Sequence, residues 1–304
     1  MITAFIIVQS NNEKIAINYY IKSMEKTDYQ IDGKKYSISI EDSPLFELGK
    51  DEVLSTKDSD ITFGQPWYNI GFSEKDFLSK EEFKSLLAGL TSSIKEIIQK
   101  ELSVNTEGFE LENYHNFVLD DAKHFKIVSK TRDLFAEDFN YPVMELTNRL
   151  SEILGFNLTD INPKDQRKVH IIVRINRPKS NDYNPPHKDI YEGVDNDSYI
   201  PKFVNFWIPI AGVTKNSSLP LAPESHKLNE KLIYRTFDGG MMEGNKYRVR
   251  MIKSWNRENG LVRSTVQNGQ VLIFSGHLIH GLAINNEEDK TRVALEFRLF
   301  KKND

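Results

Sequence analysis

Two histidines and one aspartate of this chain have the spacing of ligands for a redox-active metal ion. His187 and Asp189 are separated by one residue, and His280 lies far downstream, with Arg292 twelve residues beyond it. Two neutral imidazoles and one carboxylate can occupy one face of an octahedral Fe(II) ion and leave three positions open for a chelating cosubstrate and O2. The residue types and their spacing therefore predict an iron site formed by His187, Asp189 and His280.

The sequence around these residues predicts short strands that would position them. One strand could carry His187 and Asp189 together, because residues two apart project from the same side of the pleat. His280 would then come from a neighbouring strand. Turns rich in Asn, Asp, Gly and Pro separate several apolar or alternating stretches that are typical of strands. These stretches are 169–175, 203–210, 269–274 and 291–300.

Two helices are predicted ahead of this β-rich part. Residues 79–82 form a capping-box pattern that is followed by apolar residues at helical spacing, and a second amphipathic helix is predicted over 141–155. Both helices need an apolar partner surface, and the outside of a jelly-roll sheet would supply one. At the start of the chain the pattern predicts a short strand over 3–9 and a helix over 13–24.

Residues 168–300 resemble the phytanoyl-CoA dioxygenase-like family of Fe(II)- and 2-oxoglutarate-dependent oxygenases. Besides the His187-x-Asp189 pair and Arg292, the resemblance rests on a Pro-Glu-Ser-His turn at 223–226 and on Phe-Ser-Gly-x-x-x-His-Gly at 274–281. Family members more often have Gly where Glu224 stands, and residues 1–165 carry no motif that matches. The resemblance implies a mainly β fold with flanking helices, built on a double-stranded β-helix (jelly roll, cupin-like) core.

The resemblance also implies a dioxygenase that uses Fe(II), 2-oxoglutarate and O2. Such an enzyme decarboxylates 2-oxoglutarate to succinate and CO2 and hydroxylates a small-molecule substrate. Related halogenases lack the carboxylate ligand, so Asp189 favours hydroxylation. Two other classes stay open: a jelly-roll metalloenzyme that does not use 2-oxoglutarate, such as an isomerase or another dioxygenase, and a non-catalytic metal- or ligand-binding module. Fold-level analogy does not select the substrate.

His277 competes with His280 for the place of the third metal ligand, since it lies only three residues earlier. The family pattern places Gly directly after the ligand and an anchoring arginine ten to twelve residues later, which favours His280. His277 would then be a hydrogen-bonded neighbour of the site or a surface residue. His226 is expected to close its turn.

Arg292 is the residue that the resemblance identifies as the anchor for the distal carboxylate of 2-oxoglutarate. Apolar residues alternate with polar ones from 292 to 299, so Arg292 and Arg298 share one face of a strand. An arginine that points into a barrel needs an anion, and a guanidinium can hold a carboxylate with two parallel hydrogen bonds. A salt bridge to Glu296 is the structural alternative for Arg292, and Arg298 could take the anchoring role instead.

Three further residues are candidates for contacts with the cosubstrate. Asn205 lies on the mixed face of a predicted strand, where its amide could bind the cosubstrate, order a metal ligand or simply be solvated. Arg174 and Ser218 are candidates on the same reasoning. Lys188 stands between the two ligands and should therefore point to the opposite face from them.

The pattern of elements divides the chain into three regions of one compact catalytic unit. Two long connections, 176–202 and 236–245, would build the mouth of a substrate site, because functional residues concentrate on loops around a rigid barrel. The three regions are an N-terminal α/β extension or subdomain at 1–75, a helical support region at 76–165 and the jelly-roll oxygenase core at 166–304.

Composition restricts the partners of this chain. A net charge of −4 over 304 residues argues against a protein that coats nucleic acid or an anionic membrane. The absence of cysteine excludes disulfides and Cys-ligated metal sites, and it suits a reducing compartment. The early apolar run at 4–8 lacks a basic leader and is far too short to span a bilayer. We therefore expect a cytoplasmic protein with a small-molecule substrate, while its oligomeric state is not indicated.

Overall fold

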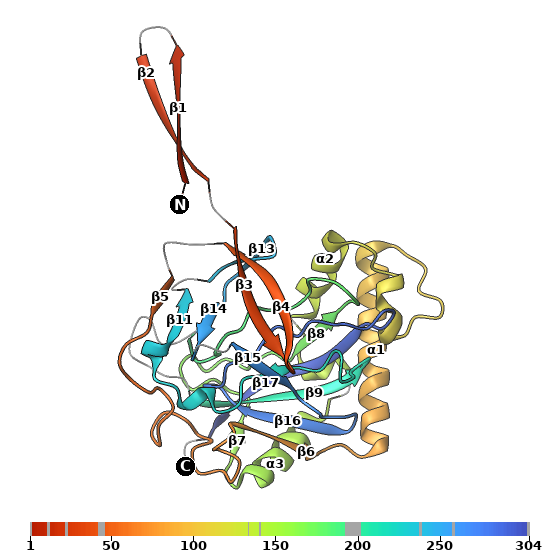
Figure 1. The fold of residues 1–304 in the computed structure, drawn as a ribbon. Coiled ribbons are helices and arrows are strands. Elements are labelled where there is room, and N and C mark those ends of the chain that lie inside the picture. Colours follow the sequence, from red (N-terminus) through yellow and green to blue (C-terminus); the bar gives the residue numbers. More distant parts are fainter. Residues whose placement is uncertain are drawn as a thin grey trace.

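The computed structural model describes residues 2–10, 13–21, 24–41, 46–132, 134–139, 141–191, 202–236, 239–256 and 259–302. The fold is mainly β with flanking helices, as the sequence predicted (Figure 1). Its helices are α1 (Lys80–Leu102), α2 (Asp121–Thr131) and α3 (Val143–Leu154) with the short 3-10 helices η1 (Leu111–Asn116), η2 (Ala136–Phe139), η3 (Ser225–Lys227) and η4 (Glu230–Leu232). The strands are β1 (Ile2–Ser10), β2 (Glu13–Ile21), β3 (Met24–Ile31), β4 (Lys34–Glu41), β5 (Phe46–Leu48), β6 (Phe72–Asp76), β7 (Leu158–Thr159), β8 (Ile172–Asn176), β9 (Phe203–Ala211), β10 (Pro220–Leu221), β11 (Ile233–Thr236), β12 (Gly240–Met242), β13 (Asn245–Tyr247), β14 (Ile252–Trp255), β15 (Gly260–Arg263), β16 (Gln270–Ser275) and β17 (Arg292–Lys301).

The main sheet has the strand order β6-β16-β9-β17-β7, with β8 also paired to β17. These pairs are antiparallel, and the register sets Leu295 of β17 beside Ile208 of β9. Successive residues of a strand alternate between faces, so Leu295 and Ile208 lie on an apolar face that belongs to the largest hydrophobic core. The opposite face carries Asn205, Trp207 and the β17 residues Arg292, Glu296 and Arg298, and we call it the inner face.

A second layer covers the inner face. It contains the sheets β10-β15-β3-β4-β12-β13 and β14-β11-β5, and two irregular segments join them. The backbone of Ala222 donates to Ile279 (2.8 Å), His187 and His280 pair with one another, and Ile252 donates to Pro186 (2.8 Å). The two layers together form the predicted jelly roll, with the inner face of the main sheet enclosed between them.

Helix α1 begins where the capping-box pattern predicted. The Ser79 side chain accepts a hydrogen bond from the backbone of Glu82, and the Glu82 side chain accepts one from the backbone of Ser79. These two bonds satisfy donors that have no partner within the first turn of a helix. Arg149 of α3 also donates to Glu82 (2.8 Å), so the start of α1 is tied to the second predicted helix.

Helices α1 and α3 pack their apolar stripes against the outer face of the main sheet. The stripe of α1 includes Leu86, Leu90 and Ile94, and that of α3 includes Leu146 and Leu150, all of which are buried in the same core as the sheet. In Figure 1 α1 and α2 lie side by side on one flank of the strands. The expectation that the helices support the outside of the jelly roll is therefore confirmed.

The helix predicted over 13–24 is wrong, because residues 13–21 form strand β2 and pair antiparallel with β1. The predicted strand over 3–9 lies within β1. Ile15, Ile17, Tyr19 and Ile21 recur with a period of two in β2, and β-branched and aromatic residues favour strands. The division of the chain into three regions stays a prediction, although β3 and β4 join the same sheet as β10 and β15 of the predicted core.

The connection predicted over 236–245 is more ordered than the sequence suggested. Its residues 240–242 form β12, which pairs with β13 and, through Met242, with Ile40 of β4. Residues 237–238 lie outside the described chain, as do residues 192–201 of the other long connection. The hairpin formed by β12 and β13 places Met242 in a buried position.

Glu224 explains why the resembling family favours glycine at this turn. Its backbone has φ of 65° and ψ of −5°, which is the left-handed conformation. This conformation crowds the Cβ of an L-residue and costs glycine nothing. Glu224 therefore changes the local strain of the turn, while its exposed side chain pairs with Lys227 at 3.5 Å.

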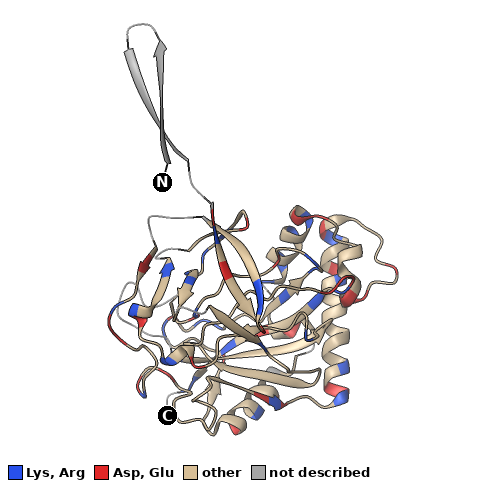
Figure 2. Ribbon diagram, in the orientation of Figure 1, with Lys and Arg blue, Asp and Glu red and all other residues tan. Residues whose placement is uncertain are grey.

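The described chain has no helix that is both long enough and apolar enough to cross a membrane. Acidic and basic residues are interspersed over the helices and loops in Figure 2. That the protein does not coat nucleic acid stays a prediction.

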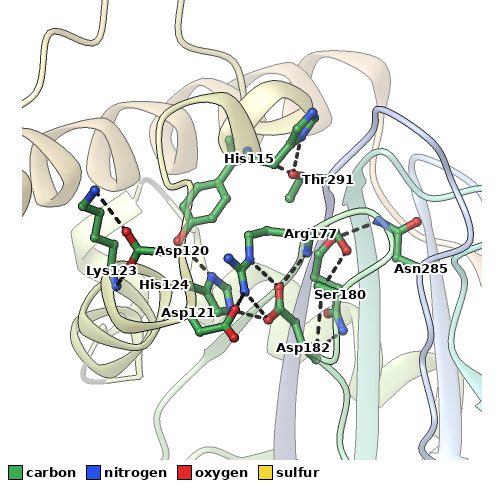
Figure 3. A network of polar contacts seen from close by, with 12 residues as sticks. His115, Asp120, Asp121, Lys123, His124, Arg177, Ser180, Asp182, Asn285 and Thr291 are labelled. Atoms are coloured by element: carbon green, nitrogen blue, oxygen red, sulfur yellow. Dashed lines mark hydrogen bonds and ion pairs between the residues drawn. The ribbon is translucent and has the colours of Figure 1, made fainter.

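A polar network, buried except for Asp121, connects α2 to the turn that follows β8 (Figure 3). Arg177 donates to both carboxylate oxygens of Asp182, at 2.8 Å each, and to Asp121 of α2 at 2.5 Å. His124 Nε2 lies 3.5 Å from Asp182, and its Nδ1 shares a 3.1 Å hydrogen bond with the Tyr114 hydroxyl. A neutral His124 satisfies both contacts if Nε2 carries the proton. Burial lowers the pKa of His124 to about 4, although Asp182 opposes this shift.

We expect Ser79→Ala to lower the free energy of unfolding by about 1 kcal/mol, because the variant loses one half of the capping box. Ser79→Asp keeps a side-chain acceptor at the same place, so its free energy of unfolding should stay within about a few tenths of a kcal/mol of the parent value. Urea denaturation at neutral pH measures both variants. Equal stability of Ser79→Ala and the parent would contradict the role of the cap.

We expect His124 to make the protein less stable in mild acid. Its folded pKa of about 4 lies below the ordinary value of 6.5, so the unfolded chain binds the proton more readily. Stability is therefore lost as the pH falls from about 6.5 towards 4. One pKa unit corresponds to about 1.4 kcal/mol, so the loss should be on the order of 2 kcal/mol.

The measurement is the difference in unfolding free energy between pH 6.5 and pH 4.5. His124→Asn should show a smaller difference than the parent, because the titrating group has been removed. His170→Asn, at an exposed position, is the control and should leave the difference unchanged. The idea fails if His124→Asn retains the full pH dependence of the parent.

Candidate metal centre and cosubstrate site

The predicted ligands sit on two irregular segments that pair with each other. The backbone N–H of His187 donates to the carbonyl of His280 (2.9 Å), and that of His280 donates back (3.1 Å). The prediction that one regular strand carries His187 and Asp189 is wrong: His187 forms an isolated bridge, and the chain turns directly after it. Pro185 and Pro186 lack an N–H and so cannot continue a strand ladder.

The side chains of His187, Asp189 and His280 form a buried cluster whose potential ligand atoms all lie within 4.8 Å of one another. His187 Nε2 is 3.4 Å from one oxygen of Asp189, and His280 Nε2 is 3.6 Å from the other. Each residue is at most 3% exposed. The sequence therefore identified three residues that the fold brings together across a separation of 93 positions, from 187 to 280.

Both imidazoles are oriented by their second nitrogen. His187 Nδ1 faces the carbonyl of Pro185 (2.8 Å), and His280 Nδ1 faces that of Leu278 (3.1 Å). A carbonyl only accepts, so Nδ1 carries the proton and the lone pair is on Nε2. Burial and the neighbouring His187 lower the pKa of His280 to about 4, which keeps its ring neutral at pH 7. The Nε2 atom of His280 is buried and has no hydrogen-bond partner.

Asp189 is held as an anion by donors on both of its oxygens. The amide of Asn205 donates to Oδ2 (2.8 Å), and Arg298 Nη2 donates to Oδ1 (2.7 Å). Burial by itself would raise the pKa of Asp189, but the guanidinium of Arg298 holds it well below its usual range. Asn205 thus orders a predicted ligand, which is one of the roles that the sequence left open.

Lys188 points away from the cluster, as its position between the ligands predicted, and it is completely buried. Its Nζ donates to Glu230 (2.7 Å), whose other oxygen accepts from the Tyr191 hydroxyl (2.6 Å). The Nε atom of Arg235 lies 3.7 Å from the same carboxylate. Glu230 therefore fixes the segment that carries the two ligands on the side facing away from the cluster, while Asn205 and Arg298 hold it on the side of the inner face.

Arg292 lies on the inner face and is 2% exposed. Its Nη2 donates to Asn176, and its guanidinium lies 5.7 Å from the centroid of the Trp207 ring. The Nε and Nη1 atoms are buried without a partner. Burial and the nearby Arg174 lower the pKa of Arg292 to about 9. Such an uncompensated cation is costly unless an anion binds to it.

The structural alternative for Arg292, a salt bridge to Glu296, is not formed. Arg174 of β8 takes that carboxylate instead, with hydrogen bonds of 2.9 and 2.8 Å to its two oxygens. Burial would raise the pKa of Glu296, but Arg174 lowers it to about 2. Arg174 therefore compensates a buried acid of the inner face and leaves the unpartnered nitrogens of Arg292 without an anion.

Ser218 is buried in the turn before β10. Its hydroxyl is buried and donates to the carbonyl of Ser264 (2.7 Å). The backbone carbonyl of Ser218 accepts a hydrogen bond from Arg263 (2.7 Å). These bonds join the turn before β10 to β15. The structure gives Ser218 this structural contact, and a role in binding the cosubstrate stays a prediction.

His277 and His226 are both buried outside the triad. His277 Nε2 lies 3.4 Å from the carbonyl of Ser59, and its backbone donates to Ser275. His226 packs edge-on against Tyr68, with the ring centroids 4.8 Å apart. The metal-like cluster found in the described residues includes neither of them.

Sequence reasoning assigned no role to Asn176, Trp207 or Glu230, and it considered Glu296 only as a partner of Arg292. Asn176 binds Arg292, Trp207 stacks near it, Glu296 pairs with Arg174, and Glu230 anchors Lys188. Asn176 is itself held by the carbonyls of Asp182 and Ala283. The alternation along β9 and β17 could have placed Trp207 and Glu296 on the inner face, but their partners depend on the register between strands.

The comparisons with known proteins begin with a family model, described as phytanoyl-CoA dioxygenase, that matches residues 74–294. This match begins well before the region that the sequence motifs had indicated. A search of curated proteins found no match.

Several solved structures are similar to this chain at low sequence identity. Apo EctD from S. alaskensis has 12% identity and a TM-score of 0.43, with 84% of each chain covered. AviO1 from Streptomyces viridochromogenes Tue57 has 15% identity and a TM-score of 0.43, over 82% of this chain and 96% of AviO1. The epimerase SnoN, solved with Fe3+, alpha ketoglutarate and nogalamycin RO, has 13% identity and a TM-score of 0.41, over 77% and 80%.

The family model spans more than half of the chain, and the matched residues include both histidines and the aspartate of the cluster as well as Arg292. The chain therefore belongs to the phytanoyl-CoA dioxygenase family of Fe(II)- and 2-oxoglutarate-dependent oxygenases, which are oxidoreductases.

Proposed function

We propose that this protein is a dioxygenase that binds Fe(II) through His187, Asp189 and His280, binds 2-oxoglutarate through Arg292, and hydroxylates a small-molecule substrate with O2. The observation that carries the proposal is the pair of buried, unsatisfied nitrogens of Arg292, which lies on the same sheet face that contacts the triad. A metal site alone would suit several enzyme classes, whereas a buried anion anchor beside it suits a chelating dicarboxylate.

The donor set fits Fe(II). Two neutral imidazoles that present Nε2 and one ionised carboxylate are the ligands of the facial arrangement, which leaves three positions open. His280 Nε2 has no hydrogen-bond partner, although a buried ring nitrogen normally has one. A metal ion at the cluster would satisfy this atom and would also compensate the negative charge of Asp189.

The inner face fits 2-oxoglutarate. Nε and Nη1 of Arg292 are unsatisfied donors on different edges of the guanidinium, and each can donate to an acceptor oxygen of an anionic ligand. The Nε1 atom of Trp207 is another buried donor without a partner, and its ring lies beside the same guanidinium. These donors can bind a ligand that has acceptor oxygens. The distal carboxylate of 2-oxoglutarate would meet this need while its 2-oxo acid end lies at the metal.

Iron with 2-oxoglutarate and O2 would supply the oxidation of a substrate C–H bond, with succinate and CO2 as products. The residues of the chain bind, orient and shield. Arg292 and Trp207 would fix the cosubstrate, Asn205 and Arg298 orient Asp189, and the two layers of the jelly roll keep water from the inner face. The carboxylate ligand favours hydroxylation over halogenation. We keep the cytoplasm as the proposed location, because the chain lacks cysteine.

We expect the purified protein to bind one Fe(II) ion per chain. His187→Ala, Asp189→Ala and His280→Ala should each weaken binding by more than roughly 100-fold, since losing a ligand should exceed the 10- to 100-fold effect of losing an outer partner. Competition with a coloured chelator under anaerobic conditions measures the affinity. His277→Gln is the matched control and should bind iron like the parent. The assignment of the third ligand is wrong if His277→Gln loses iron and His280→Ala keeps it.

We expect Arg292→Leu to bind iron normally and to bind 2-oxoglutarate at least tenfold more weakly. The lost charge-assisted hydrogen bonds are worth about 1.5–3 kcal/mol. The variant should also unfold no more easily than the parent without ligands, because an uncompensated buried cation has been removed. Calorimetric titration of the metal-loaded protein with 2-oxoglutarate tests the first point, and thermal unfolding tests the second.

Arg292→Lys keeps the charge but lacks the planar guanidinium, so its affinity for 2-oxoglutarate should lie between those of Arg292→Leu and the parent. Unchanged 2-oxoglutarate affinity in Arg292→Leu would remove the cosubstrate assignment. If the parent itself binds iron but neither binds nor consumes 2-oxoglutarate, the chain is a metalloenzyme of another kind.

A further inference from the structure

Arg298 contacts the predicted carboxylate ligand directly. It is the cross-strand partner of Asn205, so the two side chains lie next to each other on the inner face. Asn205 donates to Oδ2 of Asp189 and Arg298 donates to Oδ1. The two residues thus hold one carboxylate by its two different oxygens.

The guanidinium of Arg298 is itself fixed in place. It lies over the ring of Phe203, 5.0 Å from the centroid, and its side chain is 23% exposed. Stacking on an aromatic ring orients the plane of a guanidinium as well as attracting its charge. The donor on Oδ1 is therefore a rigid cation and not a mobile surface group.

The coordination mode of Asp189 matters for the proposed function. A carboxylate can bind a metal ion through one oxygen or through both. The cosubstrate and O2 need three open positions on an octahedral ion, which exist only if Asp189 uses one. Turning both oxygens to the metal would require Oδ1 to leave Arg298, which would lose a charge-assisted hydrogen bond.

We propose that Arg298 is a positioning residue that keeps Asp189 bound to the metal through a single oxygen and so preserves the coordination position needed by 2-oxoglutarate. This inference rests on the proposed function. Asn205 contributes to the same end, but its neutral amide opposes the attraction of the metal for the second oxygen less strongly than the guanidinium does. Outer partners of this kind often decide how a ligand is presented to its metal.

The test uses the full chain loaded with Co(II), whose visible absorption reports the number and geometry of its ligands. Arg298→Leu should still bind Co(II), but its spectrum should differ from that of the parent before any cosubstrate is added, because Asp189 then uses both oxygens. Its affinity for 2-oxoglutarate should fall roughly 10- to 100-fold. Arg298→Lys keeps a cationic donor and should restore most of the parent spectrum.

Arg292→Leu is the matched comparison on the same strand. It should show the spectrum of the parent without cosubstrate and lose only the affinity for 2-oxoglutarate, which separates anchoring from ligand positioning. Arg298→Gln keeps a neutral donor and serves as the second variant if Arg298→Leu does not fold. Its spectrum should differ from that of the parent, but by less than the spectrum of Arg298→Leu does.

A folded Arg298→Leu with the parent spectrum and the parent affinity for 2-oxoglutarate would overturn the inference. Complete loss of Co(II) from the folded variant would also overturn it, because Arg298 would then support metal affinity and not the mode of coordination. Failure of the proposed function gives a different result: the parent itself would not bind Co(II) at the triad, or would show no spectral response to 2-oxoglutarate.

Discussion

The pair of backbone hydrogen bonds between His187 and His280 is the constraint on which the rest of the site depends. The two residues come from segments that are far apart in the chain, and their reciprocal N–H to carbonyl bonds set the two imidazoles side by side. The segments also link the two sheets of the second layer. The contact that closes the jelly roll therefore also assembles the two histidines, so the predicted metal site and the closure of the fold share one structural element.

The segment that carries His187 and Asp189 is held in place by contacts on two sides. Behind it, Glu230 accepts hydrogen bonds from Lys188 and Tyr191 in a fully buried position. In front, Asn205 and Arg298 hold Asp189 against the inner face. A buried ion pair contributes little net stability, because desolvation offsets most of the attraction, but it fixes geometry when each partner is satisfied. The charges here are best explained by the positions they impose on the ligand segment.

Arg292, by contrast, is a buried charge without an ionic partner among the described residues. Asp189 and Glu296 each have arginine donors, whereas Arg292 has only the amide oxygen of Asn176 among the described residues and keeps two nitrogens unsatisfied. A fold that leaves such a group is less stable than it could be, and binding sites are where proteins commonly accept this cost. The uneven pairing of the inner face is the observation from which we infer a negatively charged ligand.

The sequence by itself determined which residue types could meet at the site and where the local elements begin. His187, Asp189, His280 and Arg292 were identifiable because their chemistry and order are specific, and α1 because a helix cap depends on neighbours three residues apart. Local patterns failed at residues 13–21, which gained a strand partner, and around His187, where two prolines interrupt the ladder. Only the tertiary structure decided that Arg174 would take Glu296, that Arg298 would take Asp189, and that Asn176 would meet Arg292. These pairings follow from the register between strands that are distant in sequence, and register is set by the packing of both layers together, which short-range periodicity does not encode.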